Sequence, residues 1–144
     1  MMHRTLPIKK IHFQDLIPHE GSMVLIDQVD DWDLNKISCS SRSHLLSNNP
    51  LMVNNSLSAM HLIEYGAQAM AIHRGLLTGK SLQGFLAAVR DANFFIDNLD
   101  NVHGALNIQA IFELKINNNV VYSLNVSDEH GTPLLKARTS VVQA

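Results

Sequence analysis

Residues 58–71, SAMHLIEYGAQAMA, place three chemically active side chains in a segment that is otherwise mostly apolar. Glu64 stands in the middle, with His61 three residues before it and Gln68 four residues after it. Positions three and four apart share one face of a helix, so a helical segment brings these side chains together. Burial disfavours the charged form of a carboxyl, so we expect the pKa of Glu64 to be raised toward neutrality. A carboxyl of that kind can donate a proton, and its alternative role is that of a buried group satisfied by neighbouring hydroxyls or amides.

A helix over residues 58–77 is predicted to position these groups. Its apolar residues fall on two stripes, one being Met60, Ile63, Ala67, Met70 and Ala71, and the other Leu62, Tyr65, Ala69 and Ile72. A helix that is apolar on most sides is surrounded by protein. Asn55, Ser56 or Ser58 can supply its N-cap, and Gly75 and Gly79 end it.

Strands are predicted on both sides of this helix. Alternating apolar residues over 106–116, 120–126 and 135–141, with turns at 117–119 and 128–132, indicate an antiparallel meander. Three more stretches, 23–32, 36–44 and 84–95, also have the character of strands, and a short helix is predicted near residues 12–17. The order of two strands, one long buried helix and four strands predicts an α+β hotdog fold, in which an antiparallel sheet wraps around one central helix. The alternative is an open α+β sandwich.

Composition limits the possible partners and compartments. The chain has 144 residues, which suits one domain over residues 1–144, and its net charge of −2 gives no basic field for nucleic acid. The single Cys39 excludes an internal disulfide framework, and a catalytic thiol is not expected there. No apolar run has the length of a signal peptide or a membrane span. We therefore expect a cytoplasmic protein without membrane insertion. The histidine spacing predicts no metal site, and we expect no cofactor.

Three motifs resemble one enzyme family. LIPHEGSMVLIDQV (16–29) is similar to the opening of the FabA/FabZ-type hotdog dehydratases, which act on 3-hydroxyacyl groups carried by acyl carrier protein. LIEYGAQAMA (62–71) resembles their central helix, and GFLAAVRDANF (84–94) resembles their next strand. The ordinary family has a catalytic histidine fourteen residues before the helix carboxylate, where this chain has Pro50. The sequence is therefore more similar to the divergent branch of hotdog dehydratases from aryl-polyene-type clusters.

The resemblance implies dehydration of a 3-hydroxyacyl thioester to a trans-2-enoyl thioester. Glu64 would protonate the leaving hydroxyl, and a histidine would take the proton from C2. His19 in the PHEG turn is the first candidate for this base, although it serves equally well as a structural turn residue. His61 is the second candidate, or else a histidine at a helix surface or dimer boundary, and His44 is the third. Gln68 would orient Glu64 or a water, or would only pack the helix.

The same resemblance suggests where substrate and partners bind. Backbone N–H groups near Ser58 and Ala59, at the helix N-terminus, would bind the thioester carbonyl. Apolar side chains would line the acyl pocket, with Met60, Phe85, Leu86 and Phe94 as candidates. Acyl carrier protein is acidic, so the surface of this chain on which it docks should be basic. The candidates are Arg74, Lys80, Arg90, Lys136 and Arg138. We expect a homodimer, or a heterodimer with a second hotdog subunit.

Two other functions fit the same features. An acyl thioesterase on the same fold would use the helix carboxylate as a nucleophile on the thioester or as a base that activates water. The fold alone does not separate thioester hydrolysis from dehydration. A non-catalytic subunit that binds a partner and shapes an active sibling is the third possibility, because the usual loop histidine is missing.

Overall fold

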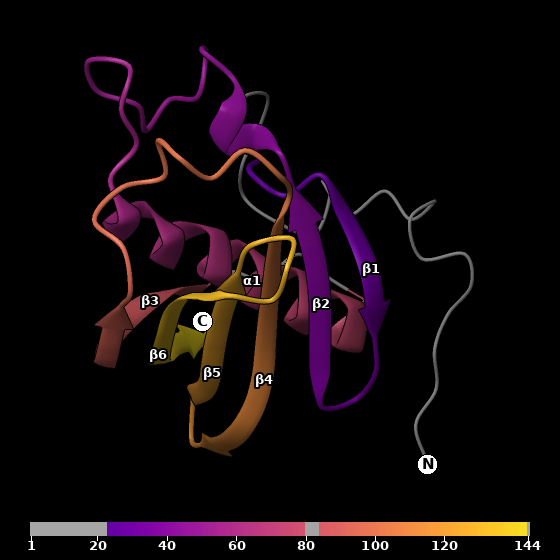
Figure 1. The fold of residues 1–144 in the computed structure, drawn as a ribbon. Coiled ribbons are helices and arrows are strands. Elements are labelled where there is room, and N and C mark those ends of the chain that lie inside the picture. The colour runs from indigo at the N-terminus through magenta and orange to yellow at the C-terminus, as the bar shows by residue number, and fades with distance from the viewer. Residues whose placement is uncertain (1–22, 80–83, 144) are drawn as a thin grey trace.

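The computed structural model describes residues 23–79 and 84–143, in which the chain forms one long helix and a six-stranded sheet (Figure 1). The strands are β1 (Gln28–Trp32), β2 (Lys36–Ser41), β3 (Gly84–Phe94), β4 (Leu106–Ile116), β5 (Asn119–Ser127) and β6 (Pro133–Gln143). The helix is α1 (Leu62–Thr78), and two short 3-10 turns are η4 (Ser43–Leu45) and η5 (Ala59–His61). The predicted order of two strands, one helix and four strands is confirmed. The helix predicted near residues 12–17 lies outside the described residues.

All neighbouring strands of the sheet are antiparallel, in the order β1-β2-β4-β5-β6-β3. The meander predicted from the alternating C-terminal residues is confirmed as β4-β5-β6. β3 pairs with β6 and forms one edge of the sheet, while β1 forms the other edge. In β6 the residues that face the helix are buried and those between them are exposed or half-buried, so the sheet has one core face and one outer face.

The first strand is shorter than its sequence predicts. Residues 23–32 contain the apolar run MVLI, but β1 begins only at Gln28. The reason lies in the hydrogen bonds of Leu25. Its N–H donates to the side chain of Gln68 and its carbonyl accepts from Ser41 and Ser43, so side chains take the place of a neighbouring strand. The second predicted strand, 36–44, likewise ends early and turns into η4.

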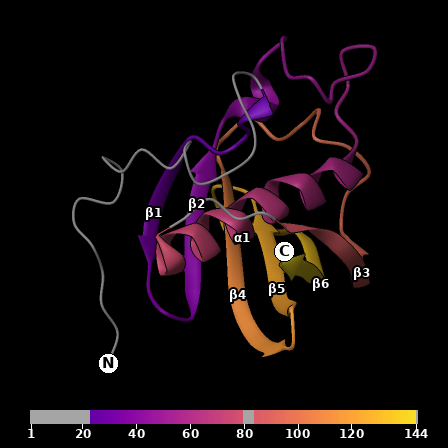
Figure 2. The same ribbon diagram turned by 180° about the vertical axis from the view of Figure 1, so that it is seen from behind.

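The helix lies across one face of the sheet (Figure 2). One predicted stripe is completely buried against the sheet, namely Leu62, Tyr65, Ala69 and Ile72. The other stripe is only partly covered within this chain, because Ile63 and Ala67 are half-buried. Gly66 permits the close approach, since a Cβ at this position would lie 2.5 Å from Cδ1 of Leu124 on β5.

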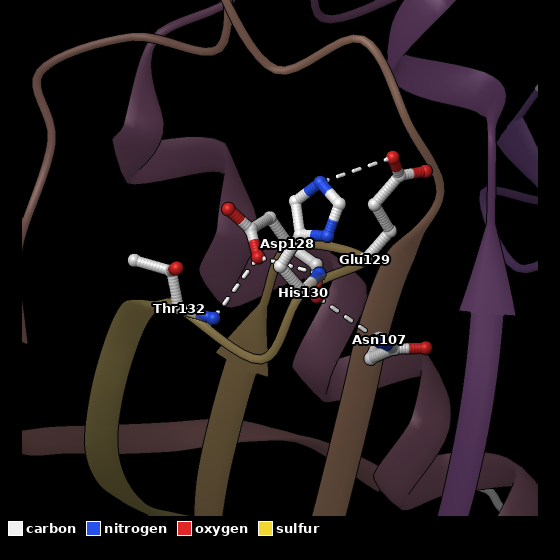
Figure 3. Close-up of polar contacts among 5 residues, drawn as sticks. All are labelled: Asn107, Asp128, Glu129, His130 and Thr132. Atoms are coloured by element: carbon white, nitrogen blue, oxygen red, sulfur yellow. Dashed lines mark hydrogen bonds and ion pairs between the residues drawn. The ribbon is translucent and has the colours of Figure 1, made fainter.

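The turn between β5 and β6 is held by one carboxylate (Figure 3). Oδ1 of Asp128 accepts hydrogen bonds from the backbone N–H groups of Thr132 and His130, each at 2.9 Å. These donors, that of Thr132 first, lower the pKa of Asp128 below its usual value. Gly131 takes a φ of 85°, a conformation that side chains disfavour. The turn predicted from this stretch is confirmed.

Candidate active site

The helix begins at a capped turn whose backbone donors are already in use. Ser58 is the N-cap of η5, and its Oγ accepts from the N–H of Met60 at 3.3 Å. The N–H of Ala59 donates to the carbonyl of Asp97 at 2.9 Å, and that of His61 donates to the carbonyl of Ser58 at 3.1 Å. The prediction of an unpaired N–H at Ala59 is therefore wrong, because the loop after β3 provides its acceptor. These three N–H groups are therefore not free donors, while binding of a thioester carbonyl near Ser58 and Ala59 stays a prediction.

Glu64 lies in the first turn of α1 and is half-buried. The sequence led us to expect a buried carboxyl, and within one chain its burial is only partial, since the helix face that carries Glu64 is not fully covered. His61 precedes it by three residues and is also half-buried. Residues at this spacing are neighbours on a helical surface. A carboxyl and an imidazole are thus presented together at the start of the helix.

Gln68 is the most constrained polar side chain near Glu64. It is 1% exposed and lies one turn further along α1. Its Oε1 accepts from the N–H of Leu25 at 2.8 Å, and its Nε2 donates to the carbonyl of Met23 at 2.7 Å. Both hydrogen bonds fix the backbone at Met23 and Leu25. Gln68 therefore connects the helix that carries Glu64 with this segment, while the predicted base His19 lies outside the described residues.

A buried polar network extends this connection to the loop before the helix. The hydroxyl of Tyr65 lies 2.7 Å from Oγ of Ser43 and accepts from Nδ2 of Asn49 at 3.1 Å. Nδ2 of Asn49 also donates to the carbonyl of Ser43 at 2.9 Å, and Oγ of Ser43 donates to the carbonyl of Leu25 at 2.7 Å. Burial raises the pKa of Tyr65, so its hydroxyl stays neutral. This network was not predicted from the sequence. A tyrosine on the buried stripe was the available signal, because a buried phenol needs a partner.

Two further histidines, His44 and His73, are engaged in the core. The ring of His44 is 4% exposed, its Nε2 lies 2.9 Å from the carbonyl of Val102, and burial lowers its pKa. His73 is completely buried between the Tyr122 hydroxyl and the Asp33 carbonyl, and burial likewise lowers its pKa. These contacts favour structural roles for both histidines.

Cys39 is buried, and burial raises the pKa of its thiol. This position agrees with the expectation that the thiol is not a nucleophile. Within residues 23–79 and 84–143, no three His, Cys, Asp or Glu side chains lie close enough together to hold a metal ion.

The candidates for the acyl pocket are open in the single chain. Met60 is 70% exposed and Phe94 is 39% exposed. The backbone of Phe85 and Leu86 belongs to β3, but their side chains lie outside the described residues. A closed pocket at Met60 and Phe94 therefore requires a second chain to cover it. Among the helices of the described residues, none is long and apolar enough to cross a membrane.

Comparison with known proteins gives one family match and a set of structural neighbours. The family model described as ApeP-like, ApeP dehydratase, matches residues 11–144. No curated protein matches the sequence.

Among solved structures, the dehydratase heterocomplex ApeI:P from Xenorhabdus doucetiae is similar with a TM-score of 0.79 and 22% identity, covering 92% of this chain and 90% of that chain. A hypothetical thioesterase with coenzyme A from Streptococcus pneumoniae TIGR4 has a TM-score of 0.60 and 11% identity, covering 81% and 84% of the two chains. AziG from S. sahachiroi has a TM-score of 0.62 and 12% identity, covering 84% and 91%. These likenesses confirm the predicted hotdog fold.

Proposed function

Because the chain belongs to the ApeP-like family, described as ApeP dehydratase, we propose that it dehydrates a 3-hydroxyacyl thioester on acyl carrier protein. The product is the trans-2-enoyl thioester, formed in fatty-acid or polyene-type biosynthesis in the cytoplasm. Membership confirms the predicted resemblance to the divergent dehydratase branch. The family match over residues 11–144 is the observation that carries the proposal.

Glu64 is the acid in this reaction and His19 is the base. The imidazole takes the proton from C2, the electron pair forms the C2–C3 double bond, and the hydroxyl leaves C3 as water with the proton of Glu64. Solvent then returns the protons to their starting groups. His61 is the alternative base, and its position three residues before Glu64 supports it.

Gln68 supports the segment of chain that lies beside Glu64. It holds the backbone of Met23 and Leu25, four and six residues after His19 in the sequence, against the helix. Small displacements near reacting groups are costly in rate, so this anchor contributes to catalysis without touching the substrate.

A second hotdog chain completes the site. The structural neighbour from Xenorhabdus doucetiae is a dehydratase heterocomplex, which supports a heterodimer over a homodimer for this chain. The open edge of β3 and the exposed side chains of Met60 and Phe94 are surfaces that a partner would cover. In such an assembly these side chains, with Phe85 and Leu86, line the acyl pocket.

Thioester hydrolysis is the second candidate, because one structural neighbour is a hypothetical thioesterase with coenzyme A. The two reactions give different products from one substrate. The experiment incubates the chain, alone and with a hotdog partner, with a 3-hydroxyacyl thioester on carrier protein. Appearance of the enoyl thioester supports the proposal. Release of free thiol without alkene supports hydrolysis, and no turnover in either arm leaves the chain as a non-catalytic subunit.

A further inference from the structure

The outer face of the sheet carries two arginines at directly opposite positions. In the register of β3 and β6, Arg90 pairs with Arg138, and both are exposed. Opposite residues of an antiparallel pair project from the same face, and like charges at such positions destabilise a sheet. Among the residues that the structure describes, neither guanidinium forms an ion pair. Folding alone therefore gives no reason to place these charges together.

One backbone irregularity lies beside this pair on β3, and another lies on β4, two strands from β6. The register of β3 shifts between Arg90 and Asn93, and Asp91 takes a φ of 52°, a conformation uncommon for a side chain other than glycine. The register of β4 against β5 shifts between Phe112 and Leu114. Bulges redirect side chains and concentrate next to functional sites. Here they flank a hollow in the outer face.

That hollow is a cavity of about 390 Å³, within the range of small-ligand pockets. Its lining contains two cations and no carboxylate, together with neutral polar groups and an apolar wall. The lining residues are Arg90, Leu114, Asn119, Val121, Arg138, Thr139 and Ser140.

A second cavity on the same face has a different charge balance. It measures about 410 Å³ and shares Arg138 with the first, but it also contains Lys136 and the carboxylates of Asp91 and Glu113. Oε2 of Glu113 accepts from the hydroxyl of Ser123 at 2.6 Å. Lys136 and Arg138 share the second cavity with two carboxylates, whereas no carboxylate lines the first cavity beside Arg90 and Arg138.

We propose that the first cavity binds a small organic phosphomonoester. The dianionic phosphate lies between Arg90 and Arg138, because guanidinium forks match phosphate oxygens. The apolar part of the ligand lies against Leu114 and Val121. This site is on the sheet face opposite the helix that carries Glu64, so it is separate from the proposed dehydration site.

Isothermal calorimetry with phenyl phosphate, inorganic phosphate and phenol at fixed ionic strength tests this site. We expect phenyl phosphate to bind more tightly than inorganic phosphate, and phenol not to bind. The Arg90→Gln and Arg138→Gln variants should each weaken binding of phenyl phosphate by about tenfold or more, as expected for a lost charged hydrogen bond. The matched control Lys136→Gln removes a cation from the same face but from the second cavity only, and should change the affinity by less than about twofold.

Thermal unfolding without ligand separates a loss of affinity from a loss of stability in these variants. Without ligand, Arg138→Gln should melt at the same temperature as the parent chain or higher, because it relieves a like-charge pair. Equal loss of affinity in all three variants would overturn the proposal, because it indicates a diffuse charge effect. Absence of phenyl phosphate binding, with acyl carrier protein binding that depends on both arginines, would also overturn it and identify a protein-docking surface.

Discussion

Replacing Gln68 with alanine should lower the free energy of unfolding by about 2–4 kcal/mol, because it detaches α1 from the segment at Met23 and Leu25. Leu25 is fully buried, so its N–H loses its acceptor with no water to replace it, which costs about 1–3 kcal/mol. Met23 is 41% exposed, so its carbonyl can be rehydrated and contributes less. The remainder comes from the space left by a side chain that is 1% exposed.

Urea unfolding followed by circular dichroism measures this loss. Gln109→Ala is the matched control, since that side chain is half-buried and its only described hydrogen bond, to Ser38, is 3.4 Å long. We expect the control to cost less than about 1 kcal/mol. Similar costs for the two variants would refute the assignment of Gln68 as an anchor.

Gln68→Glu gives the same anchor a pH dependence. A carboxyl can still accept from Leu25, but it donates to the Met23 carbonyl only when protonated. Burial therefore raises the folded-state pKa of the introduced group above its unfolded value of about 4.3. The folded state then binds more protons, so stability relative to the parent chain should fall as pH rises above that value. Parallel stability curves for the two proteins between pH 4 and pH 8 would contradict the geometry.

Three further substitutions test the core and the turns. Burial lowers the pKa of His73, so the folded state binds fewer protons than the unfolded state, and stability should fall as pH drops below about 6.5. In His73→Gln, the free energy of unfolding measured in urea at several pH values should depend less on pH. Gly66→Ala should lower the free energy of unfolding by about 1–2 kcal/mol, measured by thermal unfolding, because the added Cβ collides with Leu124. The double variant with Leu124→Ala should lose less stability than the two single variants added together. Gly131→Ala should cost about 1–2 kcal/mol because of its φ of 85°, and no change in melting temperature would contradict that conformation.

The sequence predicts the fold well because its strongest signals are local and periodic. The alternation along β4, β5 and β6 and the apolar stripe from Leu62 to Ile72 follow directly from strand and helix geometry. The start of β1 could not be predicted in this way. Residues 24–27 have the composition of a strand, but Leu25 bonds to side chains that come from the helix and from the end of β2.

In the candidate site too, positions along the helix could be predicted from the sequence, and contacts between distant segments could not. Glu64 and Gln68 stand out because polar groups interrupt an apolar helix, and Gln68 indeed binds partners 43 and 45 residues away. The contact between Tyr65 and Ser43 could not be found from spacing, since irregular loops separate the two residues. The pairing of Ala59 with Asp97 was missed for the same reason, because it depends on how the loop after β3 returns to the helix.

The most direct measurement is the rate of enoyl thioester formation by the Glu64→Gln variant in the assembled complex. Its amide keeps the size of the side chain but has no proton to give to the leaving hydroxyl. We predict a rate at least about 100-fold below that of the parent complex, as expected for loss of a general acid, while Glu113→Gln on the outer face keeps the parent rate. Enoyl formation by Glu64→Gln at the parent rate would contradict the account.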